Sequence, residues 1–185
     1  MHVLLVLDAF DALGRVFVVS NTHARRSSRD RAKHGTLPSV QRFPFAYRQR
    51  VRFGETDTQQ VVYYANYLLY AEVGRIAYLR ELGIEYQRHF VSRGIDFTIG
   101  EAHVKYRAPL RFDDEFDIKV RVGELRHSAW SFEYAIDRAD GLHCADVNTV
   151  QVCISGEPKR ATRMPDELRR VLEDAKGAEH GLRAP

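Results

Sequence analysis

A long apolar helix, predicted over about residues 65–82, most constrains what this chain can fold into. Its only charged residues are Glu72, Arg75, Arg80 and Glu81. A helix that is apolar over most of its circumference is buried rather than laid on a surface. Gly83 then stands where a glycine commonly ends a helix. The rest of the chain is therefore expected to wrap around this helix.

Strand patterns lie on both sides of the helix. Residues 46–53 alternate, with Tyr47, Val51 and Phe53 predicted on one face of a half-buried strand. Four more patterns follow the helix, over residues 97–106, 116–122, 130–136 and about 143–154. A change of phase at Gly100 predicts a β-bulge. One buried helix followed by four consecutive strands indicates an α+β fold, with an antiparallel sheet wrapped around the helix.

The distribution of charge indicates how the chain is organised. Residues 1–42 carry seven of the 28 Lys and Arg residues and three of the 25 acidic ones. The remaining 21 basic and 22 acidic residues leave the body near neutral, which argues against binding to nucleic acid. We expect an N-terminal extension outside the fold over 1–42, one domain over 43–170 and a C-terminal tail over 171–185. A short amphipathic helix is predicted to start at Pro165.

Composition excludes several other classes of protein. Cys144 and Cys153 do not form a disulfide framework in a chain of this size, so a cytoplasmic setting is expected. The longest apolar stretch, residues 3–19, is interrupted by two aspartates and an arginine, so no membrane span is expected. The eight histidines show no metal-ligand spacing, and the serine elbow of the α/β-hydrolases is absent. We therefore expect no metal and no cofactor.

The turn before the helix carries the candidate chemistry. Asp57 lies just upstream of the predicted helix start near Tyr64–Asn66, where free backbone N–H groups and the positive end of the helix dipole lie. A carboxylate beside such an anion site suits acyl chemistry, in which a carbonyl oxygen gains negative charge. The structural alternative for Asp57 is an ordinary turn residue or helix N-cap. Glu55 is interpreted as a solvated turn charge.

The segment ETDTQQVVYYANYLLYAE, together with the order of elements, resembles the opening motif of a known family. That family is the hotdog-fold acyl-CoA thioesterases of the 4-hydroxybenzoyl-CoA thioesterase-like group. Further similarity lies in VKYRAPLRFDDEF, SFEYAI and KRATRMPDEL, so the resemblance covers about residues 45–170. It implies the hotdog fold, in which an antiparallel sheet wraps around one long central helix.

The resemblance also implies roles for individual residues. Asp57 matches the catalytic carboxylate, which acts as nucleophile or general base, and the backbone N–H of Tyr64 matches the group that polarises the thioester carbonyl. The expected substrate-binding residues are Gln60, Val62, Tyr63, Asn66 and Ser131. The chain departs from the family at Gln60, where Gly is usual, and at Tyr64, where some relatives carry His. Gln60 is expected either to crowd the carbonyl or to alter the turn.

Three further expectations concern the places of individual side chains. The rings of Tyr63 and Tyr64 are expected in the core, with the functional role confined to the Tyr64 N–H. Asn66 is expected to cap or bridge the start of the helix and so to position it. Ser131 is expected to line the acyl pocket.

The expected function is hydrolysis of an acyl-CoA thioester to a free carboxylic acid and coenzyme A, with acyl carrier protein as the alternative thiol carrier. The resemblance implies a homodimer or homotetramer with active sites at a dimer interface. Two alternatives remain open. One is a hotdog hydratase or dehydratase of enoyl thioesters, which usually needs an Asp/His pair that the motif lacks. The other is a non-catalytic acyl-CoA-binding protein.

Overall fold

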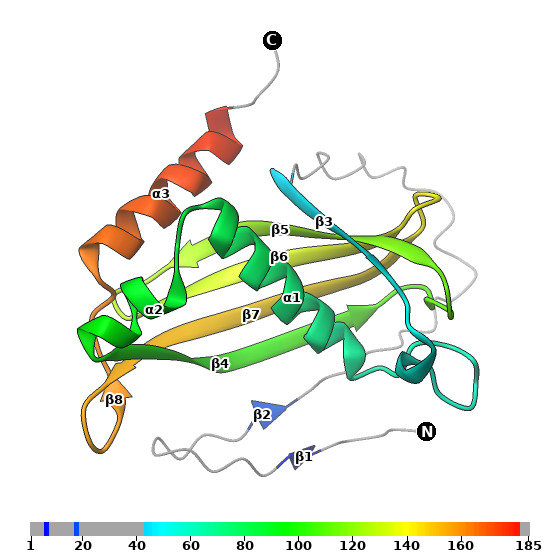
Figure 1. The fold of residues 1–185 in the computed structure, drawn as a ribbon, viewed down its shortest axis with the longest axis horizontal. Helices are drawn as coiled ribbons and strands as arrows, with labels where there is room; N and C mark the ends of the chain where they lie inside the picture. Colours follow the sequence, from blue (N-terminus) through cyan, green and yellow to red (C-terminus); the bar gives the residue numbers. More distant parts are fainter. Residues whose placement is uncertain (1–5, 8–16, 19–42, 182–185) are drawn as a thin grey trace, which may run out of the picture.

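The computed structural model describes residues 6–7, 17–18 and 43–181. Within them an antiparallel sheet curls around one long helix, α1 (Asn66–Glu81), which lies across one face of the sheet (Figure 1). The main strands follow the order β3-β5-β6-β7-β4, and every neighbouring pair is antiparallel. The prediction of an α+β fold with a sheet wrapped around one central helix is confirmed.

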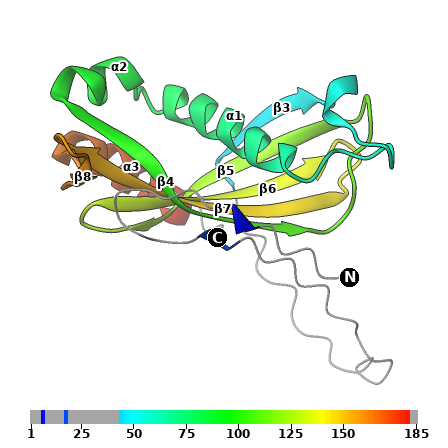
Figure 2. The same cartoon turned by 90° about the horizontal axis from the view of Figure 1, so that it is seen from below.

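The strands of this sheet are β3 (Phe45–Arg50), β4 (Ile95–Tyr106), β5 (Glu115–Leu125), β6 (Ala129–Arg138), β7 (His143–Ser155) and β8 (Arg160–Ala161). The other helical segments are η1 (Phe53–Glu55), α2 (Tyr86–His89), η2 (Val91–Arg93) and α3 (Asp166–Gly181). In Figure 2 the sheet is seen nearly edge-on, with α1 along one side of it. The short strands β1 (Val6–Leu7) and β2 (Phe17–Val18) pair with each other. The rest of the predicted extension, 1–42, lies outside the described residues.

Helix α1 begins and ends within one residue of its predicted bounds. Gly83 has a φ of +72°, and its N–H donates to the carbonyl of Arg80, so it ends the helix as predicted. Midway along the helix, Gly74 lets the backbone approach β5, because a Cβ at this position would lie 2.5 Å from Cγ2 of Ile118. On the same face, Tyr78 packs against Phe132 of β6. Glycine at residue 74 therefore sets the distance between helix and sheet.

The prediction that α1 is buried almost all round is wrong for the single chain. Leu69 is 56% exposed, Val73 39% and Ile76 37%. Their spacing places them along one face of the helix, on the side opposite Gly74 and Tyr78. A helix lying on one sheet buries only the side that faces that sheet, so a second apolar stripe remains uncovered.

Strand β3 also differs from its prediction. It ends at Arg50, and the chain then enters the short 3-10 helix η1, in which Phe53 is 78% exposed. Tyr47 is exposed as well, whereas Val51 is buried as predicted. The cause is topological, because β3 lies at the edge of the sheet, where β5 is its one partner among the described strands. The predicted bulge, in contrast, is confirmed by the register shift between Ile99 and Glu101.

The face of the sheet turned away from α1 is polar and held by cross-strand ion pairs. Nζ of Lys119 lies 2.8 Å from the carboxylate of Asp137 on the neighbouring strand. The ring of His143 bonds Asp137 through Nδ1 and Asp146 through Nε2, at 2.6 and 2.9 Å. Burial lowers the pKa of His143, but these two hydrogen bonds outweigh it, and the pKa is raised. The apolar core therefore lies between α1 and the face of the sheet that α1 covers.

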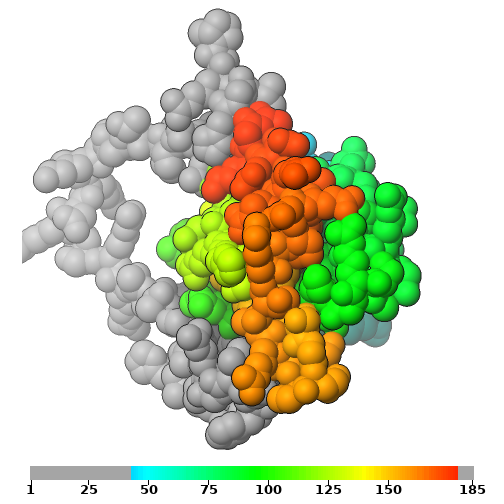
Figure 3. All heavy atoms as spheres, turned by 90° about the vertical axis from the view of Figure 1, so that its left-hand side faces the viewer, coloured from blue at the N-terminus to red at the C-terminus, as the bar shows by residue number. Residues whose placement is uncertain are grey.

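Helix α3 extends beyond the predicted domain boundary at residue 170. It continues to Gly181, and Leu168 and Leu172 are fully buried. The helix packs beside β5 at the end of the molecule shown in Figure 3, and Nζ of Lys176 donates to the carbonyl of Gly123 at 2.6 Å. The amphipathic helix predicted from Pro165 is thus longer than expected, because its apolar face closes one end of the core.

We predict that Gly74→Ala destabilises the fold by roughly 1–3 kcal/mol, because the added methyl overlaps the stiff, buried side chain of Ile118. Urea unfolding measures the effect. The control is Gly177→Ala on α3, where a Cβ meets open space and should stabilise by roughly 0.5–1 kcal/mol. An unchanged midpoint for Gly74→Ala would show that the helix can move away from the sheet at no cost.

Candidate active site

Asp57 lies in a tight, hydrogen-bonded turn between η1 and α1. Its N–H donates to the carbonyl of Val61 at 2.9 Å, and its carbonyl accepts the N–H of Gln60 at 2.9 Å. One carboxylate oxygen, Oδ1, accepts the N–H of Gln59 at 2.8 Å. Asp57 is therefore an Asx-turn residue and not the N-cap of α1, which is Ala65. Oδ2 has no hydrogen bond within the described part of the chain, and the half-buried carboxylate can use it for chemistry.

Gln60 occupies the position where the family that the motif resembles usually has glycine. The backbone conformation at Gln60 explains why glycine is usual there. Its φ is +61°, in the left-handed region that glycine adopts without steric cost. Its side chain is exposed, and its carbonyl lies 3.4 Å from Nη1 of Arg111. Gln60 therefore keeps the turn that glycine would form.

The peptide that enters α1 presents an unused donor. The N–H of Tyr64 donates no hydrogen bond within the described residues, whereas its carbonyl accepts the hydroxyl of Tyr106 at 3.0 Å. Next to it, the N–H of Tyr63 donates to the carbonyl of Glu55 at 2.9 Å. Nδ2 of Asn66 donates to the same carbonyl at 2.8 Å, so Asn66 bridges the helix start as predicted. The free N–H thus lies at the positive end of the helix dipole on a fixed backbone.

Glu55 is not a solvated turn charge, and that interpretation is wrong. Its Oε2 accepts the hydroxyl of Tyr70 at 2.8 Å and the N–H of Arg52 at 2.9 Å. Burial raises the pKa of Tyr70, and the hydrogen bond to Glu55 raises it further. Tyr70 and Asn66 are four residues apart on α1, so both face the turn. That spacing is the only signal in the sequence for this contact.

The other residues predicted near the site, Tyr63, Tyr64 and Val62, differ in burial. The rings of Tyr63 and Tyr64 are 44% and 38% exposed and pack against each other with centroids 4.4 Å apart, so their prediction as core aromatics is wrong for the single chain. Val62 is buried in the core, and its N–H donates to the carbonyl of Leu110 at 2.8 Å.

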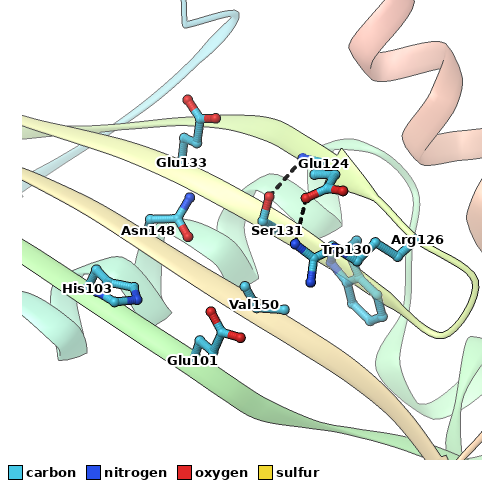
Figure 4. A pocket seen from close by; sticks show the side chains of 9 residues that line it. All are labelled: Glu101, His103, Glu124, Arg126, Trp130, Ser131, Glu133, Asn148 and Val150. Carbon is cyan, nitrogen blue, oxygen red and sulfur yellow. Dashed lines mark hydrogen bonds and ion pairs between the residues drawn. The ribbon is translucent and has the colours of Figure 1, made fainter. Parts of the chain in front are cut away.

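Ser131 lies apart from these residues. It points into a pocket of about 340 Å³ on the polar face of the sheet, with α1 behind the strands (Figure 4). Its hydroxyl accepts the N–H of Glu124 at 2.8 Å. The next residue on β6, Phe132, is buried on the opposite face, as alternation along a strand requires. The structure therefore does not bring Ser131 together with Asp57.

Other kinds of site are not found in residues 6–7, 17–18 and 43–181. No group of three or more His, Cys, Asp or Glu side chains in these ranges is arranged to hold a metal ion. Cys144 and Cys153 are buried, and burial raises the pKa of Cys153 to about 11, so it is no candidate nucleophile. None of the helices in these ranges is long and apolar enough to cross a membrane.

The sequence and the fold are both similar to those of known proteins. Residues 51–172 match the family model of the thioesterase-like superfamily. A hypothetical protein from Thermus thermophilus is similar in structure, with a TM-score of 0.65 and 34% identity over 70% of this chain and 98% of its own. A 1,4-dihydroxy-2-naphthoyl-CoA hydrolase from Thermosynechococcus vestitus is 26% identical over 70% of this chain and 88% of its own. An acyl-CoA thioester hydrolase from Escherichia coli is 26% identical over 67% of this chain and 92% of its own.

These matches span 88–98% of each relative, and the family match over residues 51–172 contains α1 and strands β4 to β8. The curled sheet and central helix are those of the hotdog fold. The chain belongs to the thioesterase-like superfamily.

Proposed function

We propose that this protein hydrolyses an acyl-CoA thioester to a free carboxylic acid and coenzyme A. The observation that carries the proposal is the unused N–H of Tyr64 at the start of α1, in the same segment between η1 and α1 as the partly free carboxylate of Asp57. Acyl transfer needs both groups: a donor for the oxyanion, and a base or nucleophile. The hydrolases of acyl-CoA thioesters among the relatives support this chemistry.

In the proposed reaction the thioester carbonyl oxygen accepts the N–H of Tyr64. Charge on that oxygen grows as the carbonyl carbon becomes tetrahedral, and the dipole of α1 stabilises it. Asp57 either takes a proton from the attacking water or attacks the carbon to form an anhydride that water then hydrolyses. In both routes the C–S bond breaks, the thiolate of coenzyme A leaves with its electron pair, and water supplies the oxygen of the acid.

Other residues of the turn support this chemistry without taking part in it. Tyr106 and Asn66 fix the backbone on either side of the Tyr64 N–H. Gln60 and Tyr63 are exposed beside the turn, where they contact the incoming thioester, and buried Val62 holds the turn against the core. Acyl carrier protein is the alternative carrier of the thioester. Because Ser131 lies on the other face of the sheet, it is left out of the acyl pocket.

The proposed enzyme acts as a homo-oligomer. Strand β4 is 12 residues long and lies at the edge of the sheet, so one side of its backbone has no strand partner among the described residues. The apolar stripe of Leu69, Val73 and Ile76 on α1 is also uncovered. Both surfaces favour association with a second copy of the chain, as a dimer or a dimer of dimers.

Asp57→Asn tests the proposed activity. We expect thiol release from a panel of aliphatic and aromatic acyl-CoAs to fall by about 10³-fold or more, because the amide can neither accept a proton from water nor attack the carbonyl. The matched control is Asp174→Asn, an exposed aspartate on α3, which should keep full activity. Equal rates for wild type and Asp57→Asn would exclude the role of this carboxylate. An inactive wild type that still binds acyl-CoA would favour a binding protein.

Gln60→Gly tests whether the departure from the family pattern limits the reaction. We expect the variant to be more stable by about 1 kcal/mol, because glycine removes the strain of the positive φ. Thermal unfolding measures this, and kcat/KM should change by less than about threefold, since the Gln60 side chain is exposed.

The neighbouring Gln59, whose φ is not positive, is the control: Gln59→Gly should lose about 0.4–1 kcal/mol. A 100-fold gain in activity for Gln60→Gly would mean instead that Gln60 obstructs the carbonyl.

Sedimentation velocity tests the proposed assembly of the 21.3 kDa chain. We expect a dimer or tetramer for wild type, and a shift toward smaller species for Val73→Lys, because a charge in the apolar stripe must be desolvated on association. Val91→Lys, at an exposed valine of η2 away from the stripe, is the control and should associate as wild type does. A monomeric wild type would contradict the proposal.

A further inference from the structure

Three buried polar atoms have no hydrogen-bond partner in the part of the chain that the structure describes. They are Nε of Arg75, Nε1 of Trp130 and Oε1 of Gln151. The three residues are 8%, 1% and 0% exposed. Buried polar groups without partners cost free energy and are rare in folded proteins, so each one calls for an explanation.

The three side chains are linked to one another through Phe97 and through strand pairing. The guanidinium of Arg75 lies over the ring of Phe97, at 5.3 Å from its centroid, and the ring of Trp130 contacts the same phenylalanine at 5.6 Å. Trp130 is directly opposite Gln151 in the β6–β7 ladder, so these two side chains point to the same face. Ile99 of β4 is opposite Gln151 on its other side. The three residues therefore belong to one cluster, which extends from α1 through Phe97 to β6 and β7.

Existing contacts fix the orientation of the two residues whose polar groups are only partly used. Nε2 of Gln151 donates to the hydroxyl of Thr149 at 2.6 Å, and that hydroxyl bonds the Tyr134 hydroxyl at 3.1 Å. The amide nitrogen of Gln151 is thus engaged, and its oxygen is left over. The guanidinium of Arg75 reaches the exposed Glu72 through Nη2 at 3.6 Å, which leaves Nε unused. The cluster consequently offers two N–H donors and one carbonyl acceptor.

This set of groups matches one kind of ligand atom. A hydroxyl accepts two hydrogen bonds and donates one, so it satisfies all three groups. A carboxylate or a carbonyl only accepts, and would leave the oxygen of Gln151 unpaired. Water brings a second O–H for which the cluster has no acceptor. We infer that Arg75, Trp130 and Gln151 bind a hydroxyl group carried by the acyl chain of the substrate, an inference that rests on the proposed function.

The place of the cluster along α1 indicates where on the acyl chain that hydroxyl lies. Arg75 follows Tyr64, the proposed oxyanion donor, by eleven residues. At the rise of an α-helix this separation is about 16 Å along the axis. A hydroxyl on a single aromatic ring next to the thioester would not reach so far. The substrate class is therefore a long acyl chain with a hydroxyl near its distal end.

Paired substrates test this inference. For 12-hydroxydodecanoyl-CoA against dodecanoyl-CoA, and for the same pair at neighbouring chain lengths, we expect wild type to prefer the hydroxylated member by roughly 10-fold in kcat/KM. Arg75→Met and Gln151→Met should bring this ratio close to one. The controls Arg80→Met, on the exposed side of α1, and Gln87→Met, on α2, should keep it. Arg75→Lys, which keeps the charge and loses Nε, replaces Arg75→Met if the latter fails to fold.

A binding measurement separates this inference from the proposed hydrolysis. Trp130 is the one tryptophan of the chain, so its fluorescence reports on the cluster directly. Titration with 12-hydroxydodecanoate should change the emission at lower concentration than titration with dodecanoate.

A selective change in emission without turnover of any thioester would support the hydroxyl site and reject the hydrolase. Equal rates on both members of every pair, with identical fluorescence titrations, would overturn the inference and leave the unpaired atoms to water only. A hydroxyl preference that survives Arg75→Met and Gln151→Met would overturn it as well.

Discussion

The close approach of α1 to the sheet is the contact on which the rest of the structure depends. At Gly74 the helix has no side chain, and the buried methyl groups of Ile118 fill the space that a Cβ would need. Larger side chains such as Tyr78 then pack on either side of this point against the strands. Because interiors are packed as tightly as crystals, this contact fixes how α1 lies on the sheet. The peptide that carries the free N–H of Tyr64 leads into this helix and is held by the bonds of Asn66 and Tyr106.

The turn before the helix is tied to it through Glu55 rather than through Asp57. The backbone carbonyl of Glu55 accepts from Tyr63 and Asn66, and its carboxylate accepts from Tyr70 inside α1. These bonds hold one end of the turn, and the hydrogen bonds within the turn hold Asp57 itself. Because Glu55 makes the bonds to α1, the carboxylate of Asp57 keeps one oxygen available for a reaction. Of these two acidic residues, two positions apart, Glu55 therefore holds the structure and Asp57 is available for chemistry.

The two faces of the sheet differ in whether their polar groups have hydrogen-bond partners. On the outer face, cross-strand pairs such as Lys119 with Asp137 satisfy one another in contact with water. On the face under α1, Arg75, Trp130 and Gln151 are buried with atoms unpaired. On the outer face, water can form a hydrogen bond with any polar group that lacks a protein partner. On the buried face, such a group must find a hydrogen-bond partner of matching chemistry. This asymmetry is why the inner cluster, rather than the outer pocket, is the candidate for recognition of the acyl chain.

The sequence by itself determined the features that depend on local periodicity and local backbone preference. These include the bounds of α1, the glycine that ends it, the bulge near Gly100, and the turn that carries Asp57 just before a helix start. The motif around Asp57 also carried the resemblance to the family. Each of these features involves residues close together in the chain, so the pattern that encodes it is visible in a short window.

Only the tertiary structure decided which side chains are covered and which groups meet. The partner of Glu55, the exposure of Tyr63 and Tyr64, the face on which Ser131 lies and the burial of Arg75 and Gln151 all depend on contacts between distant parts of the chain. Alternation along a strand says that two faces exist but not which one receives the helix. That choice is made by the order of strands in the sheet and by the packing of α1 against one side of it.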